Sequence, residues 1–359
     1  MAKNIVICCD GSGNQFGRKN SNVIKLFSTL TRNSPEQVLY YHPGVGTTGS
    51  MEVPTFFGIL AQKISKLHGL AYGFGIISNV AHAYSFLMDS YEAGDKVFVF
   101  GFSRGAYTAR VLCSMLYEFG LLEKGNQVLI EYAMSLFTNA TATNSRIAKH
   151  FKETFGRDCK PHFVGVWDTV SSVGWVYDPL ALAFTNGNPE IHIGRQAVAI
   201  DERRCYFRPN LWHECTDGQD LKQVWFTGVH SDIGGGYPRR QSGLSNISLK
   251  WMMDEAQVAG LQIDEKSKEQ IFIDVPMDSF APIHRSLHDW WWIPEYLPKQ
   301  HEVREGEAVK KEWEISAGRP RCIPENSILH QSVIDRLNHP AVNYHPPNLP
   351  KSYRIEPSK

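Results

Sequence analysis

The sequence lacks several features that would narrow its function immediately. Its 37 basic and 37 acidic residues leave no formal net charge, so nothing in the composition indicates a nucleic-acid or other polyanionic partner. Its longest apolar stretches, around residues 56–60 and 180–184, fall far short of the roughly 20 residues that span a bilayer. We find no internal repeat and no low-complexity tract. These absences favour an ordinary soluble, globular protein.

Two further absences bear on the cellular compartment in which the protein is expected. The apolar stretch at the N-terminus, Ile5 to Cys9, is too short for the core of a signal peptide, and no small-residue cleavage site follows it. The seven cysteines are scattered and odd in number, and Cys8 and Cys9 fall within a predicted buried strand, which is typical of reduced thiols. We therefore expect a cytoplasmic protein, or one exported without a cleaved signal peptide.

Short apolar runs and amphipathic runs alternate along the chain. The apolar, β-branched runs predict buried parallel strands at Asn4 to Cys9, Gln37 to Tyr41, Lys96 to Phe100, His162 to Trp167 and Gln223 to Val229. The helical patterns include Val23 to Thr31, Ile76 to Tyr91, Ala106 to Phe119 and Ser248 to Ala259. Strands that alternate with helices indicate the α/β class, with a doubly wound, mostly parallel sheet.

Three segments do not follow this alternation. They are residues 44–70, 171–194 and 278–314, and we interpret them as helical or loop inserts in a single domain that covers residues 1–359. The last insert has no clear periodicity, so the sequence predicts no fold for it.

The pentapeptide Gly101-Phe102-Ser103-Arg104-Gly105 lies between a predicted strand and a predicted helix. In a nucleophile elbow the serine occupies a strained strand-to-helix turn, and the flanking glycines avoid clashes with the neighbouring strand and helix. The same pattern also fits an ordinary glycine turn in which the serine caps the helix. The strand-to-helix setting favours Ser103 as the nucleophile of an α/β-hydrolase.

A serine nucleophile needs amide donors for the oxyanion that forms during the reaction. We expect these from Arg104, the residue after the nucleophile, and from Gly11 and Ser12, in the glycine-rich loop after the first strand. That loop also fits a plain turn, in which the Asp10 carboxylate would bond backbone amides of its own glycine turn.

The serine also needs a histidine base and a carboxylate that orients the base. Asp168 and His230 each follow a predicted core strand, so both are expected at the edge of the sheet where Ser103 lies. Asp232 with His330 is an alternative pairing that keeps the same chain order of serine, acid and histidine. Each of these residues also fits a structural role at a strand end or turn.

Several motifs in order resemble the type VI secretion phospholipase effectors of the first class. They span roughly residues 5–240 and comprise Cys9 to Asn14, Gly101 to Ala106, Val166 to Val170, Ala199 to Arg204 and Gly228 to Tyr237, with a weaker match at His330 to Val333. The resemblance implies an α/β-hydrolase fold and cleavage of phospholipid acyl esters by Ser103, Asp168 and His230. The long extra domains of the secreted effectors, which are associated with membrane engagement, are not recognisable here. The resemblance therefore leaves the toxin role and the substrate open.

Two other functions remain possible on the sequence alone. Asp10, Asp168, His230 and Asp232 could bind Mg²⁺ or Mn²⁺ in a metal-dependent phosphoesterase, because hard oxygen ligands suit these ions. The scaffold could also be a non-catalytic lipid-binding module. We expect the serine hydrolase, which requires no cofactor or metal ion, acts on a small-molecule or lipid ester, and contacts membrane surfaces only transiently if at all.

Overall fold

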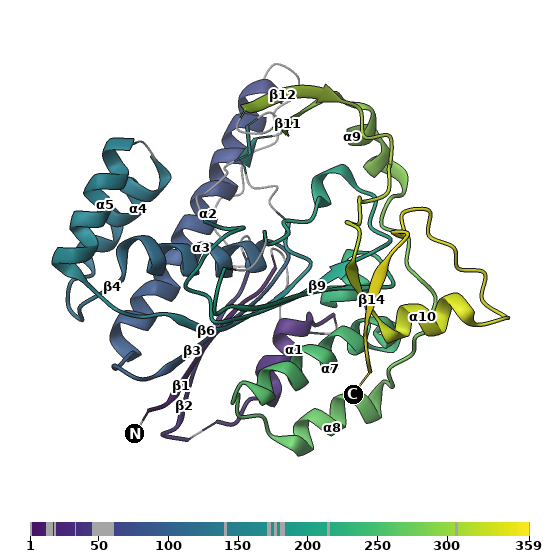
Figure 1. Ribbon diagram of the computed structural model, residues 1–359, viewed down its shortest axis with the longest axis horizontal. Coiled ribbons are helices and arrows are strands. Elements are labelled where there is room, and N and C mark those ends of the chain that lie inside the picture. The colour runs from purple at the N-terminus through teal and green to yellow at the C-terminus, as the bar shows by residue number, and fades with distance from the viewer. Residues whose placement is uncertain are drawn as a thin grey trace.

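A parallel β-sheet forms the centre of the computed structural model (Figure 1). The structure describes residues 2–11, 17, 19–32, 34–44, 61–139, 142–170, 174–175, 178–179, 184–213, 216–305 and 308–358. In these residues the sheet has eight strands in the order β14-β13-β10-β9-β6-β3-β1-β2, and every neighbouring pair is parallel. The strands are β1 (Asn4–Cys9), β2 (Gln37–His42), β3 (Lys96–Phe102), β6 (Pro161–Trp167), β9 (Ile193–Ala199), β10 (Asp220–Phe226), β13 (Ser327–His330) and β14 (Tyr353–Glu356).

The five predicted strands are all confirmed as strands of this sheet. The last of them, β10, ends at Phe226 rather than at Val229, because the chain turns there toward the short helix α6 (His230–Gly234). Three strands were not predicted, namely β9, β13 and β14. β9 begins at Ile193, inside the segment 171–194 that the sequence suggested was an insert.

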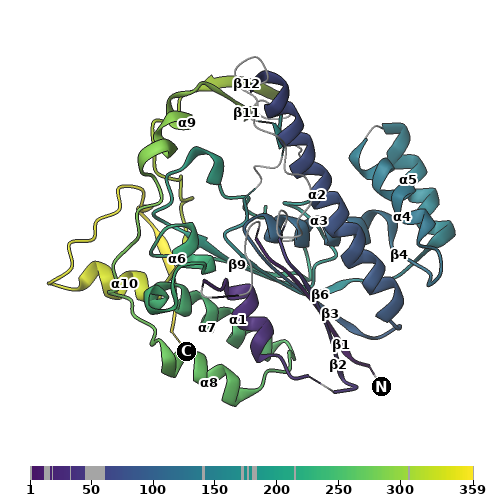
Figure 2. The ribbon, with the colours of Figure 1, turned by 180° about the vertical axis from the view of Figure 1, so that it is seen from behind.

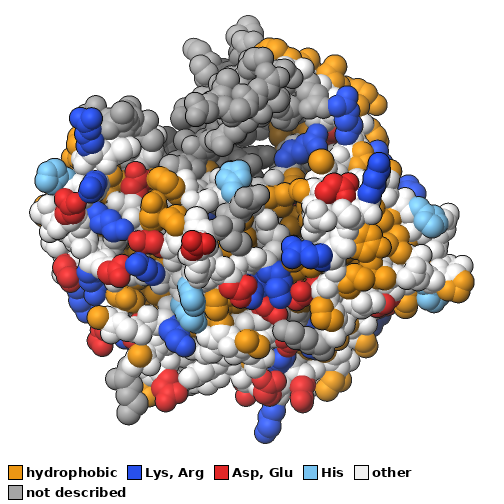
Figure 3. Space-filling view, viewed as in Figure 1, with side chains coloured by type: hydrophobic (Ala, Val, Ile, Leu, Met, Phe, Trp, Pro, Cys, Tyr) orange, Lys and Arg blue, Asp and Glu red, His pale blue; other side chains and the backbone are white. Residues whose placement is uncertain are grey.

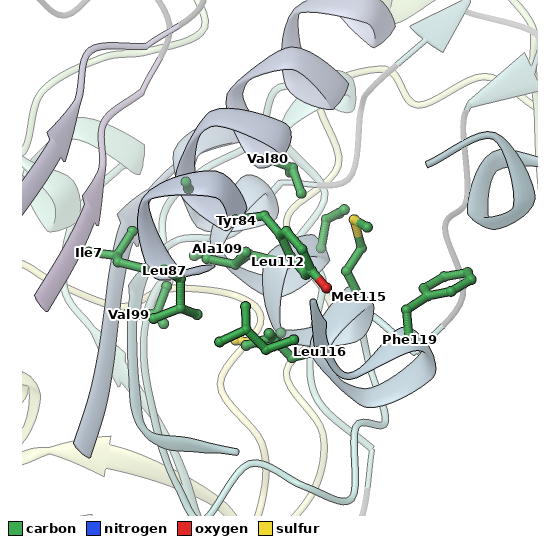
Figure 4. Close-up of a cluster of buried hydrophobic side chains, with 14 of the residues drawn as sticks. Ile7, Val80, Tyr84, Leu87, Val99, Ala109, Leu112, Met115, Leu116 and Phe119 are labelled. Carbon is green, nitrogen blue, oxygen red and sulfur yellow. The ribbon is translucent and has the colours of Figure 1, made fainter. Parts of the chain in front are cut away.

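Helices cover both faces of the sheet, on opposite sides in Figures 1 and 2. Successive residues of a strand point to opposite faces, so β1 contributes to two cores. Ile7 packs with α2 (Ala61–Ser90) and α3 (Arg104–Phe119), a cluster that Figure 4 shows in close-up. Val6 and Cys8 pack with α1 (Asn22–Thr29) and α7 (Gly243–Val258). This layering confirms the predicted α/β class.

Further elements lie outside the two main layers. The helices are α4 (Val128–Thr138), α5 (Ala142–Phe155), α8 (Glu265–Asp274), α9 (Trp292–Tyr296) and α10 (Gln331–Asn338), with short 3-10 turns at η1 (Cys205–Phe207), η2 (Arg239–Gln241) and η3 (Asp289–Trp291). The strand pairs are β4 (Leu121–Leu122) with β5 (Gly156–Arg157), β7 (Gly174–Trp175) with β8 (Asp178–Pro179), and β11 (Lys299–Glu305) with β12 (Ala308–Glu314). No helix in the described ranges is both long and apolar enough to cross a membrane.

Two of the predicted inserts can be compared with these elements. α2 begins at Ala61 and not at Ile76, so the end of the segment 44–70 is helical, whereas residues 45–60 lie outside the described residues. The segment 278–314 contains η3, α9, β11 and β12, and its two strands pair with each other and not with the main sheet.

The direction in which strands are added to the sheet reverses at β1. The chain passes from β1 outward to β2 and then returns to the other side of β1 to form β3. Cys9 at the end of β1 is paired with Gly101 in β3, so Gly11 and Ser103 follow neighbouring strand ends. In open α/β sheets, ligands bind at the carboxyl ends of strands beside such a reversal.

Candidate active site

The backbone at Ser103 forms a tight turn between β3 and α3. Its φ of 59° and ψ of −122° are rare for a residue with a side chain. A Cβ on Gly101 would lie 2.4 Å from the carbonyl oxygen of Gly105, and a Cβ on Gly105 would lie 2.2 Å from that of Cys9. The two glycines are therefore needed for the helix and strands to approach this closely, as the predicted elbow requires.

A chain of hydrogen bonds joins three of the predicted site residues. The Ser103 hydroxyl does not cap α3, and its Oγ lies 2.8 Å from Nε2 of His230, the first residue of α6. The other ring nitrogen, Nδ1, lies 2.5 Å from Oδ2 of Asp168, which follows β6. The structure thus brings together Ser103, His230 and Asp168 from three separate strand ends.

A buried arginine that the sequence analysis missed holds the carboxylate of Asp168. Arg321 donates from Nη1 to Oδ1 over 2.6 Å and from Nη2 to Oδ2 over 2.9 Å. It also donates to the carbonyl oxygens of Ala199 and Phe207. Burial alone would raise the pKa of Asp168, but Arg321 and His230 hold that pKa well below its ordinary value. The carboxylate therefore stays ionised.

The imidazole of His230 lies between two aromatic rings. The ring centroids of Phe102 and Phe207 are 4.7 Å and 4.8 Å from its own. Burial lowers the pKa of His230 below its ordinary value, although the neighbouring Asp168 opposes this effect. The site therefore favours the neutral imidazole, which is the form that can accept a proton from Ser103.

Glu202 supports the turn that carries His230, and the sequence analysis did not predict this role. Its Oε2 accepts the His230 backbone N–H at 3.2 Å, and its Oε1 accepts the Ser286 hydroxyl at 2.9 Å. Arg204 donates to both carboxylate oxygens. Burial would raise the pKa of Glu202, but Arg204 lowers it to about 2. The motif Ala199 to Arg204 contained this residue without indicating its function.

The alternative residues Asp232 and His330 have other partners. Asp232 Oδ1 lies 2.6 Å from Nδ1 of His284, and Oδ2 accepts the Val229 backbone N–H at 3.1 Å. His330 caps α10 through Ser332, with Nδ1 at 2.9 Å from the hydroxyl of that serine. The imidazole that contacts Asp232 is therefore His284, which the sequence analysis did not single out.

The expected oxyanion donors are only partly visible. The Gly11 N–H donates to Asp10 Oδ1 at 2.6 Å, in the local turn that we had considered, and Asp10 Oδ2 accepts from the hydroxyls of Ser21 and Tyr41. Ser12 lies outside the described residues. Arg104 is the first residue of α3, where amides have no acceptor within the helix. The oxyanion role of these amides stays a prediction.

The carboxylates suggested as metal ligands belong to separate networks. Asp10 contacts Ser21 and Tyr41, Asp168 contacts Arg321 and His230, and Asp232 contacts His284. Within the part of the chain that the structure describes, no three His, Cys, Asp or Glu side chains are grouped to hold a metal ion. The described residues thus offer no ligand set for the metal-dependent alternative.

The parallel sheet with helices on both faces and a serine in a strand-to-helix turn defines an α/β-hydrolase-like fold. A family model described as the catalytic domain of Tle1-like phospholipase effectors of the type VI secretion system matches residues 3–255. The chain belongs to this family.

Known proteins provide three further comparisons. An uncharacterized protein of Saccharomyces cerevisiae is 36% identical over 219 residues, which cover 57% of this chain and 32% of the yeast protein. A crystal structure of an uncharacterized Pseudomonas aeruginosa protein has a TM-score of 0.45 and 18% identity, over 78% of this chain and 49% of that one. The Tle1 effector bound to the VgrG spike has a TM-score of 0.38 and 19% identity, over 68% and 53% of the chains. The chain thus spans about a third of the yeast relative and about half of each solved chain.

Proposed function

We propose that this protein is a serine hydrolase that cleaves the acyl esters of lipids. The observation that carries the proposal is the hydrogen-bonded chain from Ser103 Oγ through His230 to Asp168. A hydroxyl, an imidazole and a carboxylate in this order are the groups that a serine nucleophile, its base and the orienting acid require.

The geometry supports a two-step reaction. His230 Nε2 takes the hydroxyl proton as Ser103 Oγ attacks the ester carbonyl, and the same nitrogen then protonates the departing alcohol oxygen as its bond to the acyl carbon breaks. Water next attacks the acyl carbon and gives a proton to His230 Nε2, and His230 then protonates Ser103 Oγ as the bond from Oγ to the acyl carbon breaks and the fatty acid leaves. Asp168 stays ionised beside Arg321 and stabilises the imidazolium in both steps.

Membership of a family named for phospholipase effectors supports a lipid ester as the substrate. The chain corresponds to only part of its longer relatives, so the activity of those whole proteins does not transfer to it directly. The lipid ester is therefore a proposal for this chain. The residues of the proposed reaction are all supplied by the chain, and none of the steps calls for a metal ion or cofactor.

The test compares Ser103→Ala with Ser114→Ala, a control on the same helix whose hydroxyl bonds the Arg110 carbonyl within α3. We expect Ser103→Ala to abolish short-ester and phospholipid hydrolysis and to prevent labelling by a fluorophosphonate. Ser114→Ala should keep both hydrolysis activities and the labelling. Activity should survive EDTA. An active Ser103→Ala variant whose turnover depends on added Mg²⁺ or Mn²⁺ would overturn the serine mechanism.

A further inference from the structure

A group of large apolar side chains is exposed on α9 and just beyond β12. Trp292 is 37% exposed, Ile293 54%, Tyr296 61% and Ile315 46%. We call these four residues the α9 patch. Hydrophobic side chains gather along the edge of the molecule over α9 and β12 (Figure 3). Contiguous exposed apolar surface of this kind usually marks an interaction site.

The α9 patch is held in place from beneath by a buried acid. Glu295 is fully buried, and its carboxylate accepts the backbone N–H groups of Cys205 at 2.6 Å and Gly318 at 3.0 Å. Its backbone carbonyl accepts the Ala317 N–H at 3.0 Å. Trp292 and Tyr296 are four positions apart on the helix, and their rings stack. The helix thus turns its one acid inward and its apolar side chains outward.

Aromatic contacts connect the α9 patch with the candidate active site. Trp291, which directly precedes α9, lies with its ring centroid 5.8 Å from that of Phe207, and Phe207 in turn contacts His230. Only two ring contacts therefore separate the histidine from the residue before the α9 patch. The α9 patch is thus linked to His230 through side chains that pack on one another.

Basic side chains border the patch. Arg203 is exposed and donates from Nε to the carbonyl oxygen of Gly318 at 2.6 Å. Gly318 packs against Trp292, and the next residue in the chain, Arg319, is exposed. Tryptophan and tyrosine favour the headgroup level of a bilayer, because their rings are apolar and their tips are polar. Arginines next to them attract anionic lipid headgroups. An aromatic pair with adjoining arginines matches an anionic lipid surface, and the proposed substrate of the neighbouring site is itself a lipid.

We propose that the α9 patch docks on the surface of an anionic phospholipid bilayer and so presents the Ser103 site to lipid. The proposal rests on the proposed function, because it concerns how a lipid ester would reach that site. It predicts that binding to bilayers and catalysis can be separated by substitution.

The experiment measures co-flotation of the full chain with vesicles of phosphatidylcholine, with and without phosphatidylglycerol. All variants are made in a Ser103→Ala background, so that binding is read without hydrolysis. Trp292→Ser, Ile293→Ser and Tyr296→Ser combined should weaken binding to anionic vesicles at least about tenfold. The matched control combines Val258→Ser and Ile273→Ser, which are 83% and 71% exposed on α7 and α8, and should bind as the parent does.

Two further measurements test whether headgroup charge contributes to binding and whether docking is needed for hydrolysis of vesicle lipid. Arg319→Gln should weaken binding to anionic vesicles but not to pure phosphatidylcholine. With Ser103 restored, the triple variant should lose hydrolysis of vesicle phospholipid but keep hydrolysis of a soluble short-chain ester.

Three results would overturn the proposal. They are unchanged vesicle binding by the triple variant, equal loss in the control, or a dimer of the parent that the triple variant abolishes while neither binds vesicles. If the wild type did not hydrolyse a soluble short-chain ester, the proposed function would be wrong, whereas flotation in the Ser103→Ala background tests membrane docking by the α9 patch independently of hydrolysis.

Discussion

Arg321 and Asp168 stand 153 positions apart in the chain, yet two hydrogen bonds join the guanidinium to both carboxylate oxygens in the interior. Arg321 is 2% exposed and Asp168 fully buried. A buried charge without a partner is strongly destabilising, so the charges of Arg321 and Asp168 compensate each other in the interior. The ion pair also fixes the side of the carboxylate that faces His230.

Arg321→Met should alter the pH dependence of catalysis as well as stability. Removing the cation leaves an ionised, buried Asp168 and costs about 3–5 kcal/mol of unfolding free energy. The uncompensated carboxylate raises the pKa of His230, so the acid limb of kcat/KM for a soluble ester shifts to higher pH.

Arg321→Lys is the control, because it keeps the charge but loses the paired hydrogen-bond geometry. It should lower kcat while leaving the acid limb near its wild-type position. If Arg321→Met lost stability without moving the acid limb, the arginine would have only a structural role.

The wild-type acid limb itself follows from the surroundings of His230. Burial lowers its pKa, Asp168 and Glu202 oppose the shift, and Arg204 adds to it. Only the neutral imidazole accepts the proton of Ser103, so kcat/KM should rise with pH around a midpoint below about 6.5 and then level off. A midpoint above that value would show that another group controls the activity.

Replacing the acid or the base should nearly abolish turnover. His230→Ala and Asp168→Asn are each expected to lower kcat by roughly 10³-fold or more, because loss of either disables proton transfer. The controls are His330→Ala and Asp232→Asn, whose partners are Ser332 and His284. Steady-state kinetics on a short acyl ester decide the matter. Inactive controls beside an active Asp168→Asn would favour the alternative pairing.

Gly105→Ala tests the packing of the strand-to-helix turn at Ser103. Its new Cβ would meet the carbonyl oxygens of Cys9 and Asp10 at 2.2 Å and 2.5 Å, and backbone atoms cannot move aside as a flexible side chain would. We expect a loss of about 1–3 kcal/mol in thermal or chemical unfolding, together with reduced activity. Gly187→Ala meets only His213, at an ordinary 3.7 Å, and should change neither. Equal stability of the two variants would contradict this account.

The strands that carry the candidate site were predictable because their signals are local. Lys96–Phe102 and Pro161–Trp167 are apolar runs that end in small or polar residues, and the glycines around Ser103 reveal the turn. β9 was missed because Arg195 and Gln196 interrupt its apolar pattern. Tertiary partners satisfy both side chains, since Arg195 pairs with Glu255 and Gln196 accepts from Arg110.

Other features depend on contacts that no local pattern encodes. β13 and β14 are short and have few fully buried residues, so their runs resemble loop sequence. Arg321 lies in an irregular segment before β13, and nothing nearby in the sequence indicates its pairing with Asp168. Glu202 is likewise recognisable only through the backbone groups that surround it.

The position of Arg321 in the chain also determines when its ion pair with Asp168 can form during synthesis. During synthesis, Ser103, Asp168 and His230 leave the ribosome before Arg321 does, and the matched family region ends at residue 255. A nascent chain that has reached only residue 255 contains the proposed nucleophile, base and acid, but not the cation that balances the buried carboxylate. The ion pair that balances the buried carboxylate of the proposed site is therefore completed only after the last part of the chain has been made, so folding of the earlier part alone leaves this charge uncompensated.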